Sequence, residues 1–216
     1  MSEVNAQVNA QLVKDLREKT GAGFMDCKTA LRETGGDLDG AVRYLRERGL
    51  AVAAKKAGRA TAEGLVGSYI HAGGKIGVLI EVNCETDFVA RTEPFQQLVR
   101  DLAMQVAAAS PLYVAKEDIP AAEIAHEREI YAAQAAQSGK PPQVVAKMVD
   151  GKVEKYASEV CLLEQEYIKE PGKSVRQVVT DAIGKLGENI TVRRFVRFRL
   201  GEGLDQTKGD DGKPQS

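Results

Sequence analysis

The chain of 216 residues has no tryptophan, two histidines and three cysteines. Cys27, Cys84 and Cys161 form no C-x-x-C pair and are odd in number, which favours a reducing compartment over a disulfide-stapled secreted domain. The start MSEVNAQVNA lacks a basic and apolar signal segment, and no apolar run approaches the roughly 18 residues of a membrane-spanning helix. We therefore expect a cytoplasmic protein with no membrane partner.

An excess of charge of one sign is also missing. The 30 lysines and arginines nearly balance the 31 aspartates and glutamates, so no overall field attracts nucleic acid. One local run mixes arginine with phenylalanine: Arg193, Arg194, Phe195, Arg197, Phe198 and Arg199. A half-solvated strand produces this alternation, and we favour that interpretation over direct binding of nucleic acid. An RNA-binding ribosome accessory protein is the alternative function.

The patterns of common catalytic sites are absent from the sequence. There is no G-x-S-x-G, no H-E-x-x-H and no glycine-rich phosphate loop. His71 and His126 have no second ligand or nucleophile at a useful spacing. Asp87 and Phe88 are followed by Val89 instead of the glycine of the kinase D-F-G motif. We expect no catalytic residue, no metal site and no cofactor, and hence a protein that is not an enzyme.

Apolar spacing predicts three short helices in residues 1–50. Val8, Leu12 and Leu16 recur every four residues in the first, which stops at the glycines after Thr20. The second begins near Phe24. The third follows an N-cap at Asp37, with Gly49 beyond its end. We expect a small three-helix domain in residues 1–50, followed by a linker over residues 51–63.

Residues 64–119 and 164–204 are expected to form an α/β core. A hairpin of residues 65–71 and 75–84 is predicted, with one face of its second strand buried: Ile76, Val78, Ile80, Val82 and Cys84. Thr92 and Ser174 are the expected N-caps of two core helices. The final strand, residues 190–200, alternates strongly. Its predicted inward side chains are Ile190, Val192, Val196, Phe198 and Leu200, and Arg194 is the one charged residue at an inward position.

Residues 120–163 interrupt this core. They are rich in alanine and charge and are divided by a Ser-Gly-Lys-Pro-Pro stretch, which is typical of a helical hairpin. The hairpin is either a surface arm or a site of self-association, since a protruding pair of helices buries little of itself. Residues 205–216 are too polar to pack and are expected to be disordered. The expected fold class is α+β, a helical domain followed by a small antiparallel sheet with helices.

The stretch EVNCETDFVART, residues 81–92, changes from a buried strand to a helix within a few residues. One interpretation is a simple turn, in which Thr86 or Asp87 caps a helical turn and Phe88 enters the core. The other is a wedge, in which a carboxylate and a large apolar ring are both presented to a partner. The local pattern alone favours the turn and does not exclude the wedge.

Two segments resemble the signatures of the bacterial elongation factor Ts family, in its compact form with one core subdomain. They are LREKTGAGFMDCK, residues 16–28, and EVNCETDFVAR, residues 81–91. Their order and separation match, and residues 138–141 and 147–149 resemble the dimerisation hairpin of that family. The resemblance covers roughly residues 8–204.

The resemblance implies a guanine-nucleotide exchange factor for elongation factor Tu in translation elongation. In that family, one segment is pressed against the GTPase near its magnesium ion and helps to dislodge the ion. The matching residues here are Thr86, Asp87, Phe88 and Val89. The resemblance also implies that the N-terminal three-helix domain is UBA-like. Contacts of this domain with the GTPase are implied for Arg17, Phe24 and Met25. A homodimer through residues 120–163 is implied as well, because a compact chain presents only one core subdomain.

Overall fold

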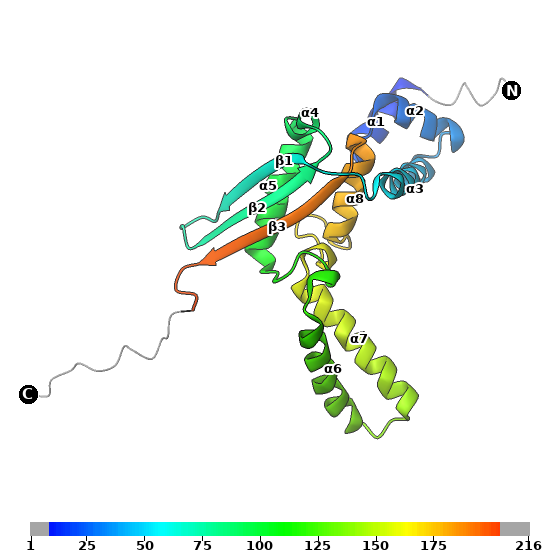
Figure 1. The fold of residues 1–216 in the computed structure, drawn as a ribbon. Coiled ribbons are helices and arrows are strands. Elements are labelled where there is room, and N and C mark those ends of the chain that lie inside the picture. Colours follow the sequence, from blue (N-terminus) through cyan, green and yellow to red (C-terminus); the bar gives the residue numbers. More distant parts are fainter. Residues whose placement is uncertain (1–8, 204–216) are drawn as a thin grey trace, which may run out of the picture.

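A computed structural model describes residues 9–203 and has the α+β fold expected from the sequence (Figure 1). Three N-terminal helices precede a three-stranded antiparallel sheet that is packed with helices on one side. A long helical hairpin projects from the end of the molecule opposite the N-terminal helices. The expected disorder of residues 205–216 and the place of Val8 lie outside the described residues.

The N-terminal helices are α1 (Ala10–Thr20), α2 (Phe24–Glu33) and α3 (Leu38–Lys56). Gly21 ends α1 in the left-handed conformation, with φ of 64°, which only glycine adopts without steric cost. The Asp37 carboxylate accepts hydrogen bonds from the first-turn amides of α3, which confirms the predicted cap. A separate small core joins the three helices: Val13, Leu16, Cys27, Ala30, Leu31 and Ala41.

The third helix does not end at Gly49, and that prediction is wrong. It continues to Lys56, into the range expected to be a linker. Gly49 packs against Gly184 of α8 (Val175–Leu186), and a Cβ on Gly184 would lie 2.8 Å from the Gly49 Cα. It is therefore Gly184 that permits a close crossing of the two helices at Gly49. Whether the N-terminal helices form a domain of their own stays a prediction.

The sheet consists of β1 (Glu63–Ile70), β2 (Ile76–Cys84) and β3 (Ile190–Arg199), with β2 in the centre. The predicted inward face of β2 is confirmed, because Val78, Ile80, Val82 and Cys84 are buried and Ile76 packs at their edge. Helices α5 (Glu93–Ala109) and α8 supply the other half of this core. Thr92 and Ser174 cap them as predicted.

The last strand departs from its predicted alternation. Val82 pairs with Val192 and Glu81 pairs with Arg194, so Arg193 is an extra residue in a β-bulge. Ile190 and Val192 face inward as predicted, but the later part of the strand is reversed. Phe195 packs on the core, whereas three residues predicted to be inward are exposed: Val196, Phe198 and Leu200.

The bulge has a clear electrostatic reason. If the same residues continued in a regular ladder without the bulge, Arg194 would lie opposite Ile80 on the buried face of the sheet. With it, Arg193 and Arg194 both reach the Glu81 carboxylate, each at 2.7 Å. The two guanidinium groups lower the pKa of Glu81 to about 2. Compared with a regular strand of the same sequence, the bulge thus keeps the Arg194 charge out of the core and exchanges the two faces of the strand beyond it.

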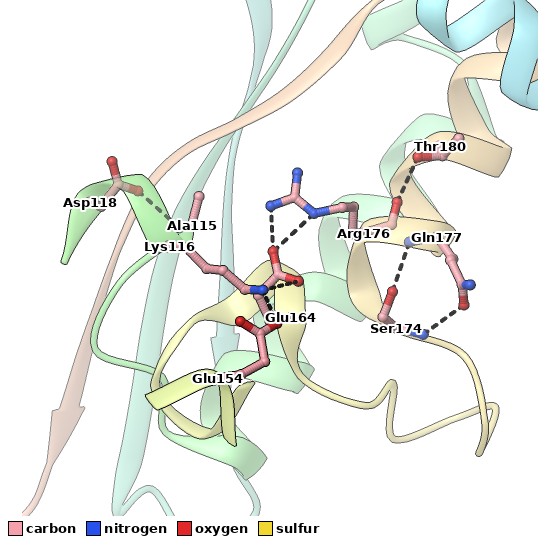
Figure 2. Close-up of polar contacts among 9 residues, drawn as sticks. All are labelled: Ala115, Lys116, Asp118, Glu154, Glu164, Ser174, Arg176, Gln177 and Thr180. Carbon is pink, nitrogen blue, oxygen red and sulfur yellow. Dashed lines mark hydrogen bonds and ion pairs between the residues drawn. The ribbon is translucent and has the colours of Figure 1, made fainter. Parts of the chain in front are cut away.

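The helical hairpin consists of α6 (Ala121–Ala136) and α7 (Pro142–Val160), close to the predicted ranges. Figure 2 shows ion pairs at its base. Lys116 of the short helix η2 (Lys116–Asp118) pairs with Glu154 of α7 and with Glu164 of η3 (Leu162–Glu164). Arg176 of α8 binds the same Glu164 carboxylate. The hairpin is thus joined to the core at one end only.

Candidate partner-binding site

The chain leaves the sheet at Cys84 and forms the single helical turn α4 (Asp87–Ala90). Thr86 is the N-cap of this turn, and its hydroxyl accepts a hydrogen bond from Val89 N at 3.5 Å. Ala90 is buried and Val89 packs against the main core, which fixes one side of the turn. Residues 86–89 are called the tip below.

Phe88 is 79% exposed and does not enter the core. The simple-turn interpretation is therefore right about the cap at Thr86 and wrong about Phe88. Asp87 points outward beside it and pairs with Arg91 at 2.8 Å. A single exposed phenylalanine is common in soluble proteins. The informative feature here is that its backbone is held firmly while its ring is presented to the surroundings.

Hydrogen bonds from a distant part of the chain hold the tip. The Glu188 carboxylate, just after α8, accepts from Thr86 N at 3.0 Å and from Thr86 Oγ1 at 2.6 Å. In the sequence, Glu188 lies between the core helix capped by Ser174 and the predicted strand of residues 190–200. Glu188 was therefore missed as a functional candidate, and no local signal identifies it, because its partner lies 102 residues earlier in the chain.

The second group of candidates lies on the N-terminal helices. Phe24 and Met25 begin α2 and are exposed, Met25 to 66%. Arg17 is exposed on α1 and is separated from them by the turn at Gly21. Figure 1 shows α2 and α4 at the same end of the molecule, away from the hairpin. The structure thus brings both groups of candidates to one end.

Other candidate chemistry is weaker. Burial raises the pKa of the Cys84 thiol, and that of Cys161 to about 11, as expected for packed side chains. Within residues 9–203 no cluster of three or more histidine, cysteine or acidic side chains could hold a metal ion. In the same part of the chain, no helix combines the length and the apolar character needed to cross a membrane.

The arginine run of the last strand is largely occupied within the protein. Arg193 and Arg194 bind Glu81, and Arg197 is mostly buried, with its Nε donating to Ala107 O at 3.4 Å. This geometry supports the interpretation of the run as part of a half-solvated strand.

Comparison with known proteins agrees with the two signature segments. The family model described as Elongation factor TS matches residues 43–202. An elongation factor Ts of Heliobacterium modesticaldum is 60% identical over 203 residues, covering 94% of each chain. That of Geobacter sulfurreducens is 57% identical with the same coverage. That of Thermoanaerobacter pseudethanolicus is 57% identical, covering 94% of this chain and all of the relative.

The α+β fold, the exposed tip and these similarities define a translation elongation factor, a protein of protein biosynthesis. Among such factors, the chain belongs to the elongation factor Ts family.

Proposed function

We propose that this protein is a guanine-nucleotide exchange factor for elongation factor Tu and acts in the cytoplasm. The observation that carries the proposal is the tip, where Phe88 projects from a backbone held by Glu188. Such a protein changes the affinity of its partner for a nucleotide and converts no substrate itself. We accordingly propose no catalytic residue, metal or cofactor in this chain, and no direct contact with nucleic acid.

The tip would act on the magnesium site of the GTPase. A magnesium ion and a phosphate-binding loop hold a nucleoside diphosphate by neutralising its charge. Asp87 and Phe88, pressed between elements of the GTPase, would shift the groups that position the ion and so weaken nucleotide binding. The coupling is reciprocal, since a bound nucleotide weakens the binding of the exchange protein to the GTPase to the same extent. Entry of GTP would therefore release the factor.

Free energies show that the tip needs help from a wider interface. Weakening nucleotide binding a thousandfold requires about 4 kcal/mol of coupling. Burial of one phenylalanine side chain contributes about 1.5–3 kcal/mol. The remainder would come from other contacts. The exposed side chains of Arg17, Phe24 and Met25 would supply part of it, since α1 and α2 lie at the same end of the molecule as α4 (Figure 1). The tip would direct the disruption, and the wider interface would supply much of the energy.

The direct test uses purified elongation factor Tu loaded with a fluorescent GDP analogue. Release is followed after addition of excess unlabelled GDP, with and without small amounts of this protein. We expect release to become faster in proportion to the added protein, with each molecule serving many GTPase molecules in turn. Release at the unassisted rate would overturn the proposal.

We also propose that a second copy of this chain binds the hairpin. A shallow groove between α6 and α7 is lined by small apolar side chains, among them Ala132 and Ala146, together with three charged residues: Arg128, Lys140 and Asp150. Light scattering over a range of concentrations should detect a dimer, and Ala146→Glu should convert it to a monomer. A dimer that survives Ala146→Glu but is lost on Phe198→Glu would place the contact on the outer sheet face and overturn the hairpin proposal.

A further inference from the structure

Two corners of the chain that are about a hundred residues apart in sequence bind each other through a reciprocal pair of carboxylates. One corner, between β2 and α4, supplies Glu85 and Thr86. The other, between α8 and β3, supplies Glu188 and Asn189. Glu188 accepts from Thr86, and Glu85 accepts from the backbone of Asn189 at 2.7 Å. These four residues are called the clasp.

Every polar group of Thr86 is used in this arrangement. Its N–H and its hydroxyl donate to the two oxygens of Glu188. Its carbonyl accepts from the Cys84 thiol at 3.1 Å and from Ala90 N at 3.3 Å. Bonds to an ionised acceptor are the stronger kind of hydrogen bond. The residue that precedes Asp87 and Phe88 is therefore fixed from both sides, although the tip is only one helical turn long.

Glu85 extends the clasp to the segment that leaves the N-terminal helices. Lys56, at the end of α3, lies 3.6 Å from one carboxylate oxygen, and Arg59 lies 3.3 Å from the other. The Asn189 side chain donates to Arg59 O at 2.9 Å. The Asn189 N–H, helped by Arg59 and Lys56, lowers the pKa of Glu85, which keeps the carboxylate ionised. The same corner thus holds the tip and the chain entering from α3.

We propose that Glu188 is a positioning residue for nucleotide exchange, which holds the tip in the orientation that acts on the GTPase, while Glu85 fixes the N-terminal helices to the same corner. This inference rests on the exchange function proposed above. A freely moving turn would lose conformational entropy on binding and would direct Phe88 less accurately. The clasp removes both losses before the partner arrives.

The decisive experiment measures two quantities as the concentration of this protein is raised. One is the maximal rate at which the fluorescent GDP analogue is released, and the other is the protein concentration that gives half of that rate. Glu188→Ala removes both acceptors of Thr86, and we expect it to lower the maximal rate about tenfold. The half-saturating concentration should change less than about twofold, since the wider interface is intact. Mere loss of folded protein would do the opposite, because it raises the concentration needed and leaves the maximal rate unchanged.

Two further variants make the test independent of folding. Glu188→Gln keeps the size of the side chain and one accepting oxygen but turns an amide N–H toward a Thr86 donor. We expect a loss of about threefold in the maximal rate. The matched control is Glu117→Gln on the exposed surface of η2, outside both proposed interfaces, which should accelerate release at the wild-type rate.

A double variant shows whether Glu188 acts through the tip. In the Phe88→Ala background, Glu188→Ala should have little further effect, because the group that it positions is gone. The inference is overturned if Glu188→Ala keeps the wild-type maximal rate, or if it slows release equally with and without Phe88. If the wild-type chain itself fails to accelerate release, the exchange function has failed, and that result is distinct from either.

Discussion

The tip and the hairpin both extend away from the main core, but they are held in different ways. The tip is one helical turn, yet buried side chains fix one side of it and Glu188 fixes the other. The hairpin is far longer, buries few of its own side chains and is joined to the rest of the chain at its base alone. Ion pairs (Figure 2), backbone hydrogen bonds such as that from Leu112 N to Val160 O at 2.8 Å, and a small apolar cluster that includes Ile119 and Cys161 make this junction. Length and exposure therefore do not indicate which projection is positioned accurately. The number and direction of the anchoring contacts do.

The largest expected effect is on the tip. Phe88→Ala should slow the release of GDP from elongation factor Tu between about tenfold and a hundredfold, which corresponds to the loss of one buried phenylalanine contact. The free energy of unfolding should change by no more than about 0.5 kcal/mol, because the side chain is exposed in the free protein. Release is measured by fluorescence and stability by urea titration.

The matched control for Phe88→Ala is Leu112→Ala. Leu112 is also a large exposed apolar residue, but it lies near the base of the hairpin. We expect its removal to leave release unchanged. Equal slowing by both variants would show that exposed apolar area in general, rather than the tip, promotes release. A large loss of stability in Phe88→Ala would return Phe88 to a structural role.

A smaller effect is expected at the base of the hairpin. The Glu164 carboxylate forms ion pairs with Lys116 and Arg176. Glu164→Gln should therefore lower the free energy of unfolding by about 1–2 kcal/mol. Urea titration measures this change. The rate of GDP release should stay at the wild-type value if the hairpin takes no part in disrupting the magnesium site. A variant that is slow in release but normal in stability would show that the two projections act together.

The smallest effect is one of pH. Hydrogen bonds lower the pKa of Glu85 in the clasp, and those from Tyr113 and Tyr156 lower the pKa of Glu123 in the hairpin. A carboxyl group whose pKa is lower in the folded protein than in the unfolded chain stabilises the fold at pH values above its unfolded pKa of about 4.3. This stabilisation is lost as the pH falls through the pKa of the folded state. The two arginine contacts of Glu81 hold its pKa at about 2, so they should persist to a lower pH than the hydrogen bonds of Glu85 and Glu123.

Hydrogen exchange of backbone amides at stepwise lower pH checks this order. Protection should decline at the clasp and the hairpin base before it declines around Glu81 in the paired strands β2 and β3. Earlier loss of protection beside the bulge would contradict the strong interaction assigned to Glu81 with Arg193 and Arg194. Uniform loss at all three places would mean that global unfolding precedes any local release.

Much of the fold follows from local patterns. Asp37, Thr92 and Ser174 are caps because short polar side chains satisfy the free amides of the first turn, and this chemistry depends on near neighbours in sequence. The alternation of β2 likewise identifies its buried face directly. Gly49 failed as a stop signal because it lies inside a helix at the crossing with α8, beside Gly184, and no local pattern contains this contact.

The candidate site was predictable only in part. The resemblance indicated which residues to examine, but the pattern of residues 81–92 did not decide whether Phe88 is buried. Glu188 could not be identified, since its function depends on contacts with Thr86 across the fold. The bulge did leave a trace in the sequence. Arg194 interrupts an otherwise apolar set, and a charge at an inward position is a sign that the register changes.

The bulge also has a consequence for variation in chain length. Val192 and Arg194 pair with adjacent residues of β2, so the strand on either side of Arg193 already has the register of an uninterrupted ladder. A chain lacking residue 193 would keep all of those pairings and the packing of Phe195, and would lose one of the two arginines on Glu81. This is therefore a position inside the sheet where a one-residue deletion leaves the same side chains in the core.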